Sequence, residues 1–153
     1  MKIIVAGAGA FGAKHLDAIK AIGDIEVVSL VGRTLEATRA VAQKYGIAHV
    51  TTELGEALER PGVEAAILAT PTQLHATQAI ACLEAGKHVQ VEIPLADNWA
   101  DAQAVAALQK KTGLVCMVGH TRRFNPSHQW IHQRIAKGGL AFALGACARP
   151  DAP

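Results

Sequence analysis

Short apolar runs rich in β-branched residues alternate along the chain with longer segments whose apolar residues recur every three or four positions. This alternation predicts β-strands separated by amphipathic α-helices. The runs that predict strands lie at residues 2–7, 25–32, 49–51, 64–70, 88–92 and 114–120. The segments that predict helices lie at residues 10–22, 34–46, 53–62, 72–86, 97–113 and 125–139.

Two of these helices carry further signals. Phe11, Ile19 and Ile22 recur at helical spacing and predict the apolar face of the first helix. Asn125 followed by Pro126 predicts the start of the last helix, because asparagine caps helices and proline is tolerated at the first helical position.

The order of these elements predicts the fold. Strands connected through helices pair in parallel, and such crossovers are right-handed. The chain is therefore expected to form an α/β fold of Rossmann type, a doubly wound parallel sheet with strand order 3-2-1-4-5-6. We expect this domain to occupy residues 1–138. Residues 139–153 are expected to be a tail with one strand at 140–147, at the start of a second domain.

The first predicted strand leads into Gly7-Ala8-Gly9-Ala10-Phe11-Gly12, which has the pattern G-x-G-x-x-G. Between a strand and a helix this pattern is typical of a dinucleotide-binding turn. Gly7 allows the sharp turn, Gly9 lets the backbone approach a pyrophosphate, and Gly12 lets the helix pack against the strand. The phosphates would lie on free N–H groups at the helix N-terminus. A glycine turn without a ligand is the alternative.

The residues about twenty positions past this motif bear on the choice of cofactor. A site for NAD usually has an acidic residue there, which binds the ribose 2′-hydroxyl. Here the strand end reads Gly32-Arg33-Thr34, without a carboxylate. Arg33 can meet a 2′-phosphate and Thr34 can add a hydroxyl donor, which favours NADP. If Arg33 only lies over the adenine, NAD is accepted as well.

Polar residues follow the later strands, where a doubly wound sheet binds its ligands. They are Thr70, Pro71, Thr72, Leu74 and His75; Glu92, Ile93 and Pro94; and His120, Arg122 and Arg123. His75 opens a helix, so a capping, surface or ligand-binding role is open. Glu92 is expected to be hydrogen-bonded or functional, because an idle carboxylate is costly to bury. Arg122 and Arg123 suit a small carboxylated substrate, whereas His15 is expected to be structural or exposed.

Composition narrows the class of protein. The 153 residues carry a formal net charge of +2 that is spread along the chain, so no nucleic-acid partner is expected. The longest late apolar run is far shorter than the ~20 residues that a membrane span needs, and glycine interrupts the apolar start of the chain. Cys82, Cys116 and Cys147 lack metal spacing and predict buried thiols, no metal site and a cytoplasmic location.

Three segments, AGAGAFGAKH, ATPTQLHATQAIACLEAGKHVQVEIPLA and GHTRRFNPSHQWIHQRI, resemble the glucose–fructose oxidoreductase/inositol dehydrogenase (Gfo/Idh/MocA) family of NAD(P)-dependent oxidoreductases. The resemblance implies that the pyrophosphate is bound by Gly7, Gly9, Ala10, Phe11 and Gly12, and the adenosine ribose by Arg33 and Thr34. It implies that the cofactor crevice is lined by Thr70, Pro71, Thr72, Leu74 and His75. It places Glu92 and Pro94 beside the nicotinamide and His120, Arg122 and Arg123 toward the substrate, with Glu92 and His120 as the catalytic residues.

The chain departs from the family in two ways. Most members have lysine in the middle of the Glu-Lys-Pro motif, where this chain has Ile93. The sequence Glu-Ile-Pro is similar to that of a narrower group, NADP-dependent dehydrogenases that oxidise the cyclic hemiacetal of a carboxylated semialdehyde. The family also continues into a second α/β domain that completes the substrate pocket, whereas the resemblance here ends near Leu140.

These departures leave three hypotheses for the chain. It is the NADP-binding half of such a dehydrogenase, a stand-alone dinucleotide-binding module, or a truncated product without catalysis. Because Ile93 cannot accept a proton, we expect the chain alone to bind dinucleotide without turnover. A second domain would provide partners for Trp130, Ile131, Phe142 and Leu144. Without it, the tail is expected either to fold back on its own domain or to pair with a second copy, and the homodimer is favoured.

Overall fold

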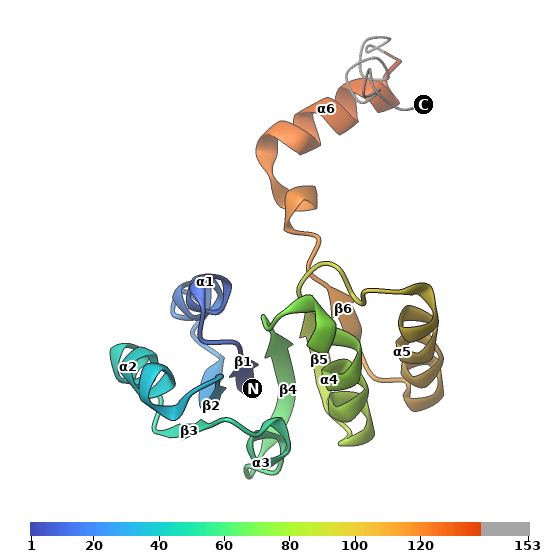
Figure 1. Ribbon diagram of the computed structural model, residues 1–153. Coiled ribbons are helices and arrows are strands. Elements are labelled where there is room, and N and C mark those ends of the chain that lie inside the picture. Colours follow the sequence, from blue (N-terminus) through green and yellow to red (C-terminus); the bar gives the residue numbers. More distant parts are fainter. Residues whose placement is uncertain (139–153) are drawn as a thin grey trace, which may run out of the picture. The chain divides into compact units, whose positions relative to one another are not determined.

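The computed structural model describes residues 1–138, and all six strands within them form one parallel sheet (Figure 1). The strand order is β3-β2-β1-β4-β5-β6, which confirms the predicted doubly wound Rossmann-type order. The strands are β1 (Lys2–Ala6), β2 (Glu26–Val31), β3 (His49–Thr51), β4 (Val63–Leu68), β5 (His88–Val91) and β6 (Cys116–Val118).

The helices connect successive strands and cover both faces of this sheet. They are α1 (Ala10–Ile19), α2 (Leu35–Tyr45), α3 (Leu54–Leu58), α4 (Thr72–Glu84) and α5 (Trp99–Thr112). Leu16 and Ile19 of α1 and Ala42 of α2 pack in one apolar cluster, while residues of α3, α4 and α5 pack in the other. The two clusters lie on opposite faces of the sheet, as Figure 1 shows for the helices that carry them.

The central strand β1 contributes to both clusters. Ile4 and Ala6 belong to the cluster with α4, and Ile3 and Val5 belong to the cluster with α1. Successive side chains of a strand point to opposite faces, so a strand covered on both sides must be apolar throughout. This explains the unbroken apolar run at the start of the chain.

Several helices are shorter than predicted, among them the helix expected at 53–62, which spans Leu54–Leu58. The first helix ends at Ile19, which is buried as predicted, whereas Phe11 and Ile22 are exposed, so the predicted apolar face was wrong at these two positions. Its buried positions are Gly12, Leu16 and Ile19, because the close approach of α1 to the glycine turn decides which side faces the sheet. The helix predicted from residue 97 begins at Trp99, after Asn98 accepts a hydrogen bond from the Asp101 N–H at 2.9 Å.

The two cysteines among residues 1–138 are at least partly shielded from solvent. Cys82 is buried and Cys116 is partly buried, and both are free thiols. Burial raises the pKa of Cys82 to about 12 and also raises the pKa of Cys116. Deprotonation of the two thiols is therefore disfavoured, and with it their reactivity.

Residues 120–138 belong to a second unit, distinct from the unit Met1–Gly119. Its described part holds the short 3₁₀ helix η1 (Thr121–Phe124) and the helix α6 (Pro126–Ala136). Asn125 caps α6 by accepting from the Ser127 N–H at 2.9 Å, as predicted. The predicted strand 140–147, with Phe142, Leu144 and Cys147, and the rest of the tail lie outside the described residues. The domain boundary at residue 138 stays a prediction.

Across residues 1–138, no helix has both the length and the apolar character that a membrane crossing requires.

Candidate dinucleotide-binding site

The glycine turn after β1 is shaped by two close backbone approaches. Gly7 has a φ of +110°, and a Cβ atom there would collide with the Ala69 carbonyl at the end of β4. A Cβ atom on Gly12 would collide with the carbonyl oxygen of Gly7. The turn, the first helix and β4 are thus packed together at a point where only glycine fits.

Gly9 differs from these two glycines. It is the N-cap of α1, with an extended backbone and no side-chain cap, and a Cβ atom on it would meet nothing within 4 Å. The space in front of Gly9 is open. The first N–H groups of a helix have no partner within the helix, so those at the start of α1 are available to an anion in that space.

A cavity of about 670 Å³ opens in front of the turn, at the carboxyl ends of β1, β2, β3 and β4. Nine of the predicted cofactor residues line it: Gly7, Gly9, Ala10, Phe11, Arg33, Thr34, Thr70, Pro71 and Leu74. Sequence reasoning missed the remaining lining residues: Ala8, Val31, Gly32, Ala37, Thr38, Val41, Thr52, Ala69 and Gln78. Thr38, Val41 and Gln78 follow the predicted residues at helical spacing, which is the signal that could have identified them.

The β2 side of the cavity carries a cation and hydroxyl groups. Arg33 and Thr34 lie at its wall and are exposed. Thr38 is buried and donates to the Thr34 carbonyl at 2.6 Å. None of the residues that line the cavity is acidic, so Arg33 is the one formal charge on its wall.

The β4 side of the cavity is held by two side chains of α4. Thr70 donates to the Gln78 amide oxygen at 2.6 Å, and both residues line the cavity. His75 lies behind the wall, with only 1% of its surface exposed. Its Nδ1 is 2.7 Å from the Pro94 carbonyl oxygen and its Nε2 is 2.8 Å from the Thr70 carbonyl oxygen. His75 therefore connects the segments that follow β4 and β5.

Glu92, directly after β5, is hydrogen-bonded, which is one of the two roles expected for it. Its Oε1 is 2.8 Å from Nε2 of His15 on α1, and both side chains are largely buried. This pair joins α1 to the end of β5. Sequence reasoning did not connect the two residues, which are 77 positions apart. Gly12, Thr72, Glu92 and Pro94 are not among the residues that line the cavity.

The predicted substrate residues His120, Arg122 and Arg123 belong to the second unit. Arg122 and Arg123 line a surface cavity of about 750 Å³ within that unit, together with His128, Gln129, His132 and Gln133 of α6. This lining has cationic and neutral polar groups and no carboxylate. Among residues 1–138 there is no group of three or more His, Cys, Asp or Glu side chains that could hold a metal ion.

Comparison with known proteins decides the family. The model of the Gfo/Idh/MocA oxidoreductase family, NAD-binding Rossmann fold, matches residues 1–120. The chain belongs to this family. The matched residues include the glycine turn, the wall of the 670 Å³ cavity and the His15–Glu92 pair. They constitute the NAD(P)-binding Rossmann module of an oxidoreductase.

Individual relatives agree with this assignment. The chain is 64% identical over 142 residues to 4-carboxy-2-hydroxymuconate-6-semialdehyde dehydrogenase of Sphingobium sp. SYK-6, a match that covers 93% of this chain and 45% of the relative. A crystal structure of a probable dehydrogenase from Thermotoga maritima has a TM-score of 0.85 and 28% identity, over 92% of this chain and 42% of that one. Biliverdin reductase from Synechocystis sp. PCC 6803, solved with biliverdin and NADP⁺, has a TM-score of 0.81 and 26% identity, over 89% and 43%. The chain thus spans less than half the length of these relatives.

Proposed function

We propose that the chain is the NADP-binding part of a dehydrogenase and that it prefers NADP over NAD. The observation that carries the proposal is the wall of the cavity beside β2, where Arg33 is the one charged residue and no carboxylate is present. A guanidinium group can bind the 2′-phosphate of NADP through two parallel hydrogen bonds. The 2′-hydroxyl of NAD lacks the charge that such a group recognises.

Replacing Arg33 with alanine is expected to lower NADPH affinity by one to two orders of magnitude and to leave NADH affinity nearly unchanged. Loss of a charge-assisted hydrogen bond costs ~1.5–3 kcal/mol, which corresponds to that range. Isothermal titration calorimetry with both cofactors measures the effect. Arg39→Ala is the matched control, because Arg39 lies on α2 away from the lining of the cavity and its loss changes the net charge equally.

Equal losses of NADPH and NADH affinity in Arg33→Ala would contradict the proposed preference. Arg33 would then contribute by lying over the adenine, which both cofactors share, and the site would accept either.

For the whole protein, we propose that the reaction is oxidation of the cyclic hemiacetal of 4-carboxy-2-hydroxymuconate semialdehyde to 2-pyrone-4,6-dicarboxylate, in cytoplasmic degradation of protocatechuate. The high identity to a dehydrogenase of that name supports this substrate class. In the reaction a hydride passes from the hemiacetal carbon to the nicotinamide and the hydroxyl proton passes to a base. Glu92 and His120 are the proposed catalytic residues, and His120, Arg122 and Arg123 are proposed to bind the small carboxylated substrate.

This proposal is tested with a chimera that joins residues 1–138 to the second half of the Sphingobium relative. The chimera is expected to form NADPH when the substrate is added. An inactive but folded chimera would instead favour a binding module without catalysis.

We also propose that the chain forms a homodimer. Trp130, Ile131 and Ile135 of α6 are each between 42% and 54% exposed, an apolar strip of the kind that usually contacts a partner. Light scattering is expected to give the mass of two copies for the chain and of one copy for Trp130→Glu. Gln129→Glu, on the same helix, is the matched control and is expected to stay dimeric. A monomeric wild-type chain would contradict the proposal.

A further inference from the structure

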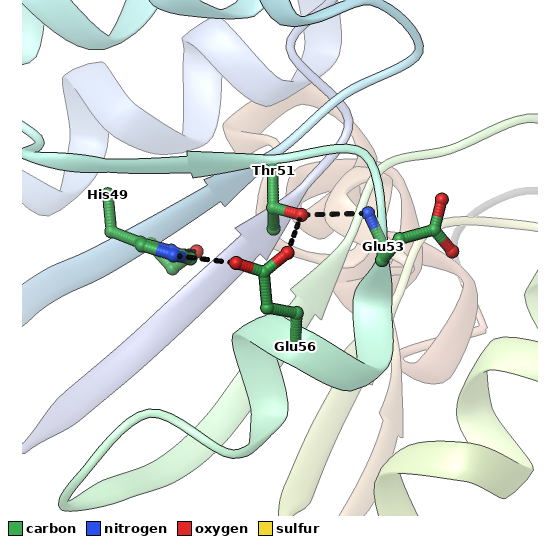
Figure 2. Close-up of polar contacts among 5 residues, drawn as sticks. His49, Thr51, Glu53 and Glu56 are labelled. Carbon is green, nitrogen blue, oxygen red and sulfur yellow. Dashed lines mark hydrogen bonds and ion pairs between the residues drawn. The ribbon is translucent and has the colours of Figure 1, made fainter.

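A chain of hydrogen bonds joins β2, β3 and α3 beside the dinucleotide cavity. Figure 2 shows His49 and Thr51 pointing toward Glu56 from β3. Nε2 of His49 is 3.2 Å from Oε1 of Glu56, and the Thr51 hydroxyl donates to Oε2. On the other side of the ring, Nδ1 of His49 is 2.9 Å from Oγ of Ser29 on β2. We call Ser29, His49, Thr51 and Glu56 the Glu56 clamp.

The donors and acceptors of the Glu56 clamp match when His49 is neutral and Glu56 is ionised. The Ser29 hydroxyl then donates to Nδ1 of His49, and the Nε2–H group donates to the Glu56 carboxylate. The hydrogen bond from Thr51, followed by that from His49, lowers the pKa of Glu56 and so favours the carboxylate. Both carboxylate oxygens of Glu56 are thereby hydrogen-bonded, Oε1 by His49 and Oε2 by Thr51.

The sequence of contacts Ser29–His49–Glu56 resembles the relay of a hydrolase, but its burial excludes that chemistry. Ser29 is completely buried, so its hydroxyl cannot reach a substrate. A nucleophilic serine must contact the group that it attacks. The Glu56 clamp therefore has a structural role. Its position at the end of β3 indicates which part of the cavity it holds in place.

The clamp fixes the end of β3, which forms part of the cavity. Thr51 accepts a hydrogen bond from the Glu53 N–H at 3.0 Å, as Figure 2 also shows, and this closes the turn around Thr52. Thr52 lines the cavity. The Thr51 carbonyl also accepts from the Gly32 N–H at 3.1 Å, directly before Arg33. A single hydroxyl-bearing residue thus links the two segments that form this side of the site.

This side of the cavity is the side of the adenosine. In a doubly wound sheet the pyrophosphate lies at the first strand and the adenosine ribose at the end of the second, so β3 flanks the adenosine half. We propose that Glu56, which does not line the cavity, is a positioning residue for the adenosine half of the dinucleotide, acting through Thr51 on Thr52 and Gly32. This inference rests on the proposed dinucleotide binding.

The test compares ligands that carry different halves of the cofactor. Binding of NADPH, adenosine 2′,5′-bisphosphate and nicotinamide mononucleotide is measured by calorimetry or NMR titration for wild type and Glu56→Ala. We expect Glu56→Ala to weaken NADPH and adenosine 2′,5′-bisphosphate by a similar factor, about five- to tenfold, because hydrogen bonds to a charged acceptor are lost. Nicotinamide mononucleotide binding is expected to stay the same.

Three further variants separate positioning from a general loss of structure. Glu56→Gln is expected to restore adenosine affinity to within about twofold, because its amide can accept from Thr51 and donate to the other tautomer of His49. Glu59→Ala removes an exposed carboxylate at the end of the same helix and is expected to bind like wild type. Thr51→Val replaces the hydroxyl with a methyl group at nearly the same volume and is expected to reproduce Glu56→Ala. It takes the place of that variant if Glu56→Ala does not fold by circular dichroism.

The outcomes distinguish failure of this inference from failure of the proposed function. If the wild-type chain binds neither NADPH nor NADH, the proposed function is wrong. If wild type binds NADPH but Glu56→Ala and Thr51→Val bind every ligand as wild type does, the positioning role is wrong. A loss that is equal for the adenosine and nicotinamide ligands would also overturn it, because a general loosening of the domain weakens both.

Discussion

Replacing Gly9 with alanine is expected to weaken dinucleotide binding by up to about 100-fold and to leave the stability of the fold unchanged. Nothing lies within 4 Å of the position of an added Cβ atom, and the φ of −81° is one that alanine adopts readily. The methyl group would instead occupy the space in which the pyrophosphate approaches the turn. Overpacking of a closely fitted contact costs about 1–3 kcal/mol, and the upper end of this range corresponds to a ~100-fold loss of affinity.

Gly12→Ala provides the contrast to Gly9→Ala. An added Cβ atom there would collide with the carbonyl of Gly7, a backbone group that cannot move without opening the turn. We expect the free energy of unfolding to fall by about 3 kcal/mol, with dinucleotide binding lost as a consequence. Urea unfolding and calorimetry on both variants separate the two effects. A Gly9→Ala variant that binds NADPH normally, or that unfolds as early as Gly12→Ala, would contradict our assignment of the open space to the ligand.

Replacing His75 with alanine is expected to lower the free energy of unfolding by about 3 kcal/mol. The imidazole is 1% exposed, so its removal leaves a cavity. It also removes the contacts with the carbonyl oxygens of Thr70 and Pro94. A ring with one N–H can donate to only one of these oxygens, and it donates to both when both nitrogens carry hydrogen.

The effect of His75→Ala is measured by urea unfolding followed by circular dichroism, with the exposed His128→Ala as the control. We expect the midpoint to shift in His75→Ala and to stay in place in His128→Ala. Because Thr70 lines the cavity, NADPH affinity is expected to fall as well. Coincident unfolding curves for wild type and His75→Ala would show that the two carbonyl contacts do not hold the strand ends.

The sheet could be predicted because each of its determinants is local. The alternation of apolar strands with helices, the right-handed crossover and the glycine turn are all properties of short segments. Arg33 and Thr34 could be predicted for the same reason, because only one helix and one strand, α1 and β2, separate them from the glycine motif in the sequence. Helix ends were predictable where a side chain or glycine acts on its own neighbours, as Asn125 does for α6.

The face of α1 could be predicted only in part from apolar residues, which gave Ile19 correctly. Phe11 and Ile22 have helical spacing but are exposed, whereas Gly12 is buried. The reason is that a glycine, which carries no apolar side chain, brings α1 into contact with the turn and so selects the side that faces the sheet. The spacing of apolar residues cannot predict this contact, because it depends on Gly12 having no side chain.

The sequence by itself determined the strand order, the glycine turn and the candidate residues at the strand ends, because these follow from neighbours in the chain and from the handedness of the backbone. Only the tertiary structure decided which of those residues share a cavity and which side chains hold its walls. His15 meets Glu92 across 77 positions, and Ser29 meets His49 across 20. Such pairs form because packing of the helices on the sheet brings distant side chains within hydrogen-bonding distance, and once they are partly buried they must satisfy each other.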